Sequence, residues 1–165
     1  MTLSLYYRTF RHIGVIYAPE AGEFILKEPH NILDESWQPY LPQGALAEKL
    51  THPSYEKKKI YHVTCDKNVA MSDMDLLVNG IELEDGHVYA DEVTYVNEAD
   101  RSQIGIEIHS GKNRIVRRML EHLGYRVNKL DRVLFAGLTK KNLRRGDWRY
   151  LTDKEVNMLR MGAYE

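Results

Sequence analysis

The sequence predicts an α+β fold with a mixed, largely antiparallel sheet and packed helices. Short stretches of alternating apolar and polar residues, typical of half-buried strands, are interspersed with short amphipathic helical stretches, without the regular alternation of βαβ units. The chain has 165 residues, of which 43% are hydrophobic and 28% charged, so it is long enough for one domain with a real core. No apolar run approaches the roughly 18–20 residues of a membrane span.

Residues 1–43 differ from the remainder of the chain. They are rich in proline and show little periodicity. We predict two short strands here, at 13–17 and 23–26, joined by a Pro-Glu-Ala-Gly turn. The first residues lack the long apolar segment of a signal peptide. We therefore treat residues 1–43 as a divergent N-terminal segment and residues 44–165 as the main domain.

The elements become distinct from residue 44 onwards. Residues 45–50 are good helix formers, and residues 59–65 alternate in the manner of a strand. One face of this strand carries Tyr61, Val63 and Cys65. A short helix follows, for which Ser72 and Asp75 have the spacing of a capping box and Gly80 marks the end.

The second half of the domain continues the same pattern. Residues 87–96 predict a strand region, and residues 104–108 predict a strand with three isoleucines on its core face. Residues 113–123 predict an amphipathic helix that ends before Gly124, and residues 125–138 another strand. The apolar stripe of this helix is Ile115, Val116, Met119, Leu120 and Leu123.

The last predicted helix begins at a capping box. Thr152 is followed three residues later by Glu155, which is the spacing that this motif requires. The core-facing stripe of the helix is Val156 and Leu159, with either Met158 or Met161. The sequence thus predicts an element order in which strands and helices alternate irregularly.

The net charge of −1 conceals a strong partition along the chain. Residues 71–107 contain ten acidic residues and one arginine, whereas residues 112–146 contain eleven basic residues and two acidic ones. Such asymmetry indicates one surface that faces a polyanion and another that faces away from it. The alternative is that the two blocks attract each other within the fold.

Several kinds of site are disfavoured by the sequence. The seven histidines have no cysteine partners at ligand spacing, so we expect no metal. A phosphate-binding P-loop is absent, because Gly111-Lys112 is followed by Asn113. The single cysteine, Cys65, excludes an internal disulfide and fits a reducing, cytoplasmic setting.

The stretch "HSGKNRIVRRMLEHLGY" places four cations where a helix begins: Lys112, Arg114, Arg117 and Arg118. A helix N-terminus carries partial positive charge, so cations are better placed at the other end. An anion bound at this helix start would satisfy both the arginines and the backbone N–H groups. The alternative is an ordinary solvated polar face.

Tyr61 is the second candidate site residue. It lies in a predicted strand next to Lys57, Lys58, Lys59 and His62. A tyrosine in a strand most often packs in the core. An aromatic ring among basic residues also suits stacking on a nucleobase beside a phosphate backbone.

These features resemble a known family. The stretches "LTHPSYEKKKIYHVT", "NGIELEDG", "IEIHSGKNRIVRRMLEHLGY" and "KLDRVLFAGLTKKNLRRGDWRYLTDKEV", in this order, are similar to the C-terminal part of bacterial rRNA pseudouridine synthases of the RsuA/RluB type. The resemblance covers about residues 44–162. It implies a pseudouridine synthase catalytic domain that is incomplete at its N-terminal side and has no S4-type RNA-binding module.

The resemblance also implies an activity and its residues. The family isomerises a chosen uridine of ribosomal RNA to pseudouridine, using a catalytic aspartate, a flipped-out base and no cofactor. It implies that Tyr61 packs against the target base and that Arg117 pairs with the catalytic aspartate. The RNA-binding residues that it implies are Lys59, Lys112, Arg114, Arg118 and Arg132. We expect a cytoplasmic monomer whose partner is ribosomal RNA, with no membrane and no small-molecule cofactor.

The chain departs from the family upstream of "GALAEKL". The family motif "GRLDxxTxGLLLLTND" is replaced by "HNILDESWQPYLPQG", in which Leu33-Asp34 alone echoes the Leu-Asp pair. Pro39 and Pro42 cannot lie within a central strand. Three alternatives remain: a truncated or frame-shifted member, a divergent enzyme with Asp34 as its catalyst, or a catalytically impaired relative that retains only RNA binding. Asp34 could equally be a loop or capping residue.

Overall fold

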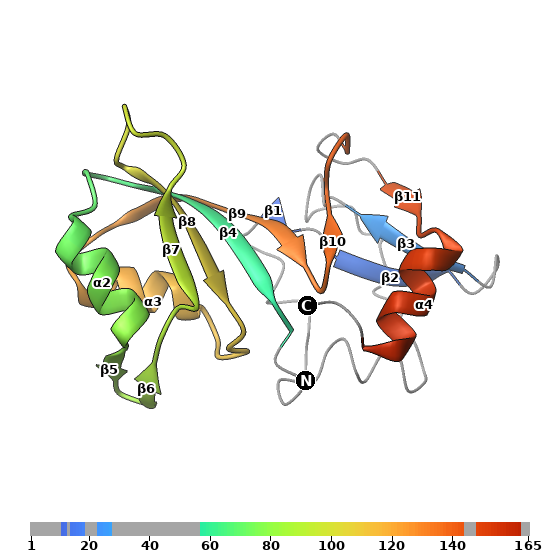
Figure 1. Cartoon of the computed structure of the whole chain (residues 1–165), viewed down its shortest axis with the longest axis horizontal. Coiled ribbons are helices and arrows are strands. Elements are labelled where there is room, and N and C mark those ends of the chain that lie inside the picture. Colours follow the sequence, from blue (N-terminus) through green and yellow to red (C-terminus); the bar gives the residue numbers. More distant parts are fainter. Residues whose placement is uncertain (1–10, 13, 19–22, 28–56, 144–147, 163–165) are drawn as a thin grey trace, which may run out of the picture.

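A computed structural model describes residues 57–143 and 149–162 in full, and the backbone of Trp148 and of the three short strands at 11–12, 14–18 and 23–27. The predicted helix at 45–50 and the candidate catalyst Asp34 lie outside the described residues. Within them, strands and helices alternate irregularly around a sheet in which a single strand pair is parallel (Figure 1). The predicted α+β class is therefore confirmed.

The main sheet has six strands in the order β1-β9-β4-β8-β7, with β10 paired to β9. Its strands are β1 (Arg11–His12), β4 (Lys59–Cys65), β7 (Glu92–Tyr95), β8 (Gln103–Ile108), β9 (Val127–Phe135) and β10 (Leu138–Thr139). β4 lies at the centre and pairs antiparallel with both β8 and β9, whereas β1 pairs parallel with β9. The predicted strand at 59–65 is confirmed at both ends.

One end of this sheet packs against two helices and a hairpin. These are α2 (Met71–Asn79), α3 (Ile115–His122), β5 (Ile81–Leu83) and β6 (Gly86–Val88). The three isoleucines of β8 are at most 1% exposed and meet the apolar stripe of α3 in one core cluster. Period-two alternation in the strand and 3.6-residue periodicity in the helix thus produce the faces that the sequence predicts.

The predicted capping box at the start of α2 is wrong. The helix begins two residues earlier than the Ser72 cap implies, with Ala70 at the N-cap, and Ala70 has no side chain that can accept a hydrogen bond. The hydroxyl of Tyr125 accepts from the Ala70 N–H (3.1 Å) and donates to Asp73 Oδ2 (2.5 Å). A residue 55 positions away in the sequence therefore caps this helix. The predicted end at Gly80 is confirmed, with a φ of 101°.

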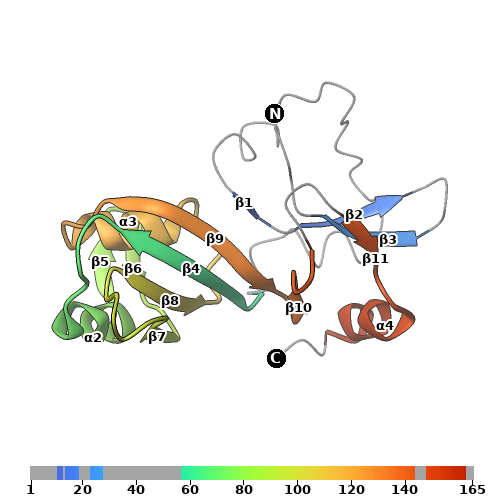
Figure 2. The same ribbon diagram turned by 90° about the horizontal axis from the view of Figure 1, so that it is seen from above.

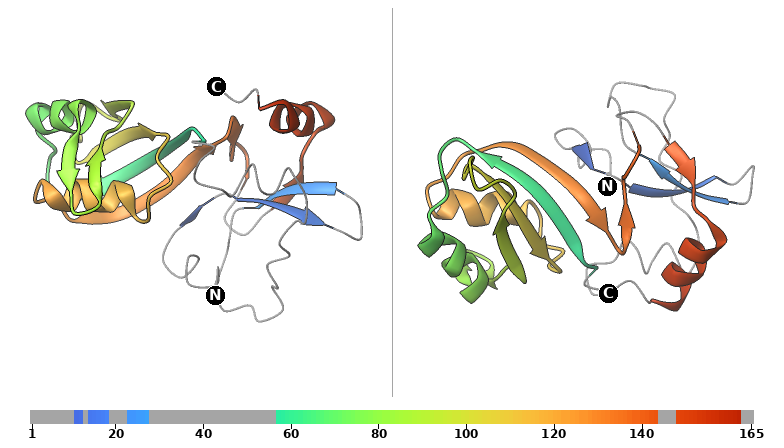
Figure 3. Two further views of the ribbon diagram at one scale, coloured as in Figure 1. Left: turned by 90° about the horizontal axis from the view of Figure 1, so that it is seen from below. Right: turned by 45° about the horizontal axis from the view of Figure 1, so that its top comes forward.

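A second group of elements lies at the other end of the molecule (Figures 1 and 2). It contains β2 (Gly14–Ala18), β3 (Glu23–Lys27), β11 (Trp148–Tyr150) and α4 (Asp153–Met161). β3 pairs antiparallel with both β2 and β11, so the predicted N-terminal hairpin is confirmed. The two views of Figure 3 show the β9–β10 hairpin between this group and the α2–α3 end.

The capping box at the start of α4 is confirmed. The Glu155 N–H donates to Thr152 Oγ1, and the Glu155 carboxylate accepts from the Thr152 N–H. Leu159 is fully buried in a second core cluster, against which Met158 packs, whereas Met161 is 76% exposed. Met158 therefore completes the apolar stripe, because it packs against this cluster and Met161 does not.

Candidate nucleic-acid interface

Tyr61 and Arg132 lie opposite each other on the central strands. Tyr61 of β4 pairs with Arg132 of β9 on one side and with the buried Ile106 of β8 on the other. Residues directly opposite in a sheet share a face, so both side chains point to the core side. Both are half-buried, and Tyr61 packs against the edge of the main core. The structure thus brings together two of the predicted site residues.

A β-bulge brings Arg132 and Phe135 to the same face of the sheet. Ile60 pairs with Leu134 while Tyr61 pairs with Arg132, so one extra residue of β9 is inserted at this point. Arg132 and Phe135 are three residues apart and would point to opposite faces of a regular strand. The bulge places them on one face, and the Arg132 guanidinium carbon lies 4.7 Å from the centre of the Phe135 ring. This stacking holds the cation beside Tyr61.

Lys59 forms an internal contact in the structure. Its ammonium group donates to the carbonyl oxygens of Lys57 (2.8 Å), His109 (2.9 Å) and Ser110 (3.2 Å). These bonds fasten the loop that leads into α3 to the start of β4. His109 Nδ1 also lies 2.7 Å from Asp91 Oδ2 at the base of the same loop. The predicted contact of Lys59 with RNA stays a prediction.

The segment that enters α3 contains a strained arginine. Arg114 has φ 51° and ψ 27°, the left-handed region that residues with a Cβ rarely adopt, and its side chain is exposed. The helix therefore begins at Ile115, two residues later than predicted. Arg118 donates its backbone N–H to the Arg114 carbonyl (3.0 Å), which closes the first turn.

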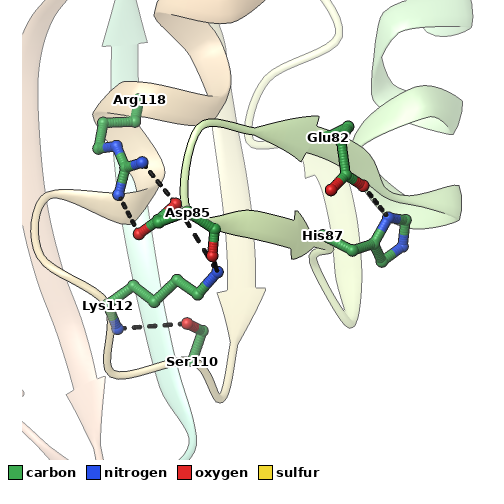
Figure 4. Close-up of polar contacts among 6 residues, drawn as sticks. All are labelled: Glu82, Asp85, His87, Ser110, Lys112 and Arg118. Atoms are coloured by element: carbon green, nitrogen blue, oxygen red, sulfur yellow. Dashed lines mark hydrogen bonds and ion pairs between the residues drawn. The ribbon is translucent and has the colours of Figure 1, made fainter.

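Asp85 supplies the anion at this helix start. It lies in the two-residue turn between β5 and β6, where its side chain points between Arg118 and Lys112 (Figure 4). Arg118 donates Nη1 to Oδ2 (2.9 Å) and Nη2 to Oδ1 (2.6 Å). Lys112 Nζ donates to the Asp85 carbonyl (2.8 Å) and lies 3.7 Å from Oδ1. We name these three residues the Asp85 clamp.

The contacts of the Asp85 clamp join a negative charge to two positive charges. Hydrogen bonding from Arg118 and the positive charge of both cations lower the pKa of Asp85 to about 2, so the carboxylate is ionised at neutral pH. The same contact raises the pKa of Arg118. Two of the four cations that the sequence places at this helix start are thus compensated within the protein. Asp85 is not among the predicted site residues, because its only signal in the sequence is its place in the "LEDG" turn, which does not identify a partner.

Arg117 points to another part of the sheet. Its Nη1 donates to the carbonyl oxygen of Val127 at the start of β9 (2.8 Å). Burial and the charge of Arg114 lower the pKa of Arg117. Val127 pairs with Cys65, which is four residues from Tyr61, or about 13 Å along the strand. The described residues therefore do not place Arg117 beside Tyr61, and its predicted partner Asp34 lies outside them.

The described residues offer no metal site and no activated cysteine. Among them, no group of three or more His, Cys, Asp or Glu side chains could hold a metal ion. Cys65 is buried, and burial raises the pKa of its thiol to about 11, so it is protonated at neutral pH. Within the same residues, no helix is both long enough and apolar enough to cross a membrane.

Comparison with known proteins identifies relatives of one kind. The chain is 36% identical over 123 residues to "Ribosomal large subunit pseudouridine synthase B" of Vibrio cholerae, a match that covers 73% of this chain and 38% of the relative. It is 39% identical over 121 residues to the protein of the same name in Bacillus subtilis, covering 71% of this chain and 49% of the relative. An "Uncharacterized RNA pseudouridine synthase" of Aquifex aeolicus is 31% identical over 117 residues, covering 70% and 47%.

The fold has a counterpart among solved structures. A protein described as "Crystal structure of pseudouridylate synthase" superimposes with a TM-score of 0.62 at 24% identity, over 69% of this chain and 50% of that one. No protein-family model matches the sequence. The chain spans less than half of the length of the curated relatives described above. Over the matched region, which is nearly three quarters of its length, the chain belongs to the RsuA/RluB-type family of bacterial ribosomal RNA pseudouridine synthases.

Proposed function

We propose that the chain binds ribosomal RNA and isomerises one uridine to pseudouridine. The observation that carries this proposal is the 31–39% identity to curated pseudouridine synthases over 117–123 residues of the chain. The charge partition supports it, because the basic block from residue 112 onwards is suited to the phosphate backbone. The partner is then ribosomal RNA, and the protein acts as a cytoplasmic monomer without a cofactor.

The reaction is an isomerisation in which atoms are conserved. The N-glycosidic bond between N1 and C1′ of uridine breaks, the base turns, and a carbon–carbon bond forms between C1′ and C5, whose hydrogen leaves as a proton while N1 takes up a proton. Asp34 is our candidate for the catalytic carboxylate and Arg117 for its partner. Tyr61 packs against the flipped-out base, and Arg132, held over Phe135, faces the nucleotide beside it.

The contacts of the basic side chains support different proposed roles for them. Arg114, whose side chain is exposed, and Arg132, whose guanidinium stacks on Phe135, are our candidates for phosphate contacts. Lys59, Lys112 and Arg118 are engaged by carbonyl or carboxylate oxygens of the protein, so we assign them first to the shape of the site. The proposed boundary between the divergent segment and the catalytic region stays at residue 44.

A direct experiment is the chemical mapping of pseudouridine in ribosomal RNA that lacks the modification, after incubation with the full chain. The proposal predicts one new pseudouridine with the wild-type chain and none with Asp34→Asn. A product that persists in Asp34→Asn would remove that residue from the mechanism. If the wild-type chain gives no product with either ribosomal subunit's RNA, the proposed activity is wrong.

A second function is favoured by one specific observation. The family's "GRLD" motif is not intact in this chain, while the basic segment of the fold is present. RNA binding without isomerisation is the corresponding alternative. It predicts salt-dependent binding of ribosomal RNA fragments together with the absence of any new pseudouridine.

A further inference from the structure

We propose that Asp85 is a positioning residue, which holds Arg114 in the conformation that presents its guanidinium group to an RNA phosphate. The proposal rests on the proposed RNA-binding function and assigns a role to a carboxylate that touches no nucleic acid. Three features carry it: the rigidity of the hairpin that bears Asp85, the two cations that it holds, and the strained residue between them.

The β5–β6 hairpin holds Asp85 in a fixed position. Ile81 of β5 and Val88 of β6 are 7% and 3% exposed and belong to the main core cluster. Their strands are joined by a two-residue turn, in which Leu83 pairs with Gly86. Gly86 has a φ of 103°, which only glycine adopts readily. The carboxylate of Asp85 is therefore held at a defined place relative to the sheet.

The two cations of the clamp flank Arg114 in the sequence. Lys112 lies two residues before it and Arg118 four residues after it. Lys112 donates to the backbone carbonyl of Asp85, and Arg118 donates both terminal nitrogens to its carboxylate (Figure 4). Both ends of the segment that contains Arg114 are thus fixed to the same turn.

A left-handed arginine requires such support. A residue with a Cβ pays a conformational cost in this region and persists there only where its surroundings determine the backbone. Arg114 is exposed, so burial of its own side chain does not provide the constraint. We infer that the clamp contributes to it from both sides, together with the buried Ile115 and the bond from the Arg118 N–H to the Arg114 carbonyl. Without the clamp, the segment can relax to an ordinary backbone conformation, and the Arg114 side chain then points elsewhere.

The test measures binding of the full chain to a fragment of ribosomal RNA as a function of salt. Loss of one phosphate contact lowers the slope of log K against log salt by about 0.7 for single-stranded RNA. Arg114→Gln should lose this contact and about fivefold in affinity. Asp85→Asn should show the same two changes, although it makes the protein less acidic and would otherwise favour RNA. The double variant should be no weaker than either single variant.

Two controls separate positioning from other roles. Glu82→Gln removes a charge from the same hairpin, where Glu82 is exposed and faces His87 (3.4 Å), and should leave the slope unchanged without weakening RNA binding. Asp85→Glu keeps the charge but moves the carboxylate by one methylene, and should lie between wild type and Asp85→Asn. Thermal unfolding of each variant establishes that the binding assay is run on folded protein.

Each outcome decides the proposal. Tighter RNA binding by Asp85→Asn would mean that Asp85 only masks Lys112 and Arg118 from RNA, which overturns it. A lower melting temperature with unchanged affinity and slope would show a purely structural role and also overturns it. Additive losses in the double variant would separate Asp85 from Arg114. Absence of RNA binding by the wild-type chain would instead contradict the proposed function itself.

Discussion

Replacing Glu155 by glutamine should destabilise α4 at neutral pH and have little effect at low pH. The Glu155 carboxylate accepts from Arg149 Nη1 (2.9 Å) and Nη2 (2.7 Å), and from the Thr152 N–H (2.8 Å) and hydroxyl (3.1 Å). These bonds, those from Arg149 most strongly, lower the pKa of Glu155 to about 2. Glutamine keeps the shape but loses the negative charge.

The magnitude follows from this pKa. The fall of the Glu155 pKa from its ordinary value near 4.5 to about 2 corresponds to about 3 kcal/mol if all of it appeared as stability. The Glu155 and Arg149 side chains are 24% and 35% exposed, so solvent screening reduces the expected loss to about 1–2 kcal/mol. The pKa is lower in the folded state, so this contribution is present above the ordinary pKa near 4.5 and is lost as the pH falls towards 2.

The assay is urea unfolding of the full chain at pH 7 and at pH 3, followed by far-UV circular dichroism. The difference in free energy of unfolding between wild type and Glu155→Gln should shrink between these two pH values. Asp153→Asn is the matched control, because it removes a charge from the same first turn and should cost only the smaller helix-dipole contribution. A difference that does not depend on pH, or an equal loss in Asp153→Asn, would refute the reasoning.

Three further predictions follow from the contacts of the described residues. Tyr125→Phe removes the hydroxyl that caps α2 and bonds Asp73, and should lower the free energy of unfolding by about 1–2 kcal/mol in urea unfolding. Phe135→Leu should weaken RNA binding in wild type but not in an Arg132→Gln background, since it acts through the stacked guanidinium. Cys65 should react with a thiol reagent only as fast as the protein unfolds, because its thiol is buried and has a pKa of about 11; rapid labelling of native protein would contradict this.

Local patterns predict much of the fold. The alternation in residues 59–65 and the three isoleucines of β8 identify two central strands and their core faces, because each strand has one face against the helices. The capping box of α4 is predicted correctly because both of its residues lie within one helical turn. Such signals are encoded within a few residues, and so they can be recognised in a single sequence.

Contacts between distant segments are not predictable in the same way. Tyr125 caps a helix that begins 54 residues earlier, at Met71, so the nearby Ser72–Asp75 spacing was misleading. The β9 bulge that brings Arg132 and Phe135 to one face depends on pairing with β4. It cannot be recognised from the alternation of apolar and polar residues in β9 alone.

In the candidate site too, local patterns are predictable from the sequence and contacts between distant residues are not. The excess of cations at the start of α3 predicts a bound anion, which stays a prediction; the structure shows that the carboxylate of Asp85, 33 residues from Arg118, already pairs with that arginine. Sequence spacing identifies the charged residues and cannot show which of them meet. Tyr61 and Arg132 come together through strand pairing, whereas Arg117 is drawn to the Val127 carbonyl.

The most direct test of the central claim follows the hydrogen at C5 of uridine. Conversion to pseudouridine replaces this hydrogen by the bond to C1′, so ribosomal RNA labelled with tritium at C5 must release tritium to water. The account predicts release with the wild-type chain, limited to one equivalent per RNA molecule, and none with Asp34→Asn. Folded wild-type chain that binds the RNA but releases no tritium from either ribosomal subunit's RNA would contradict the account.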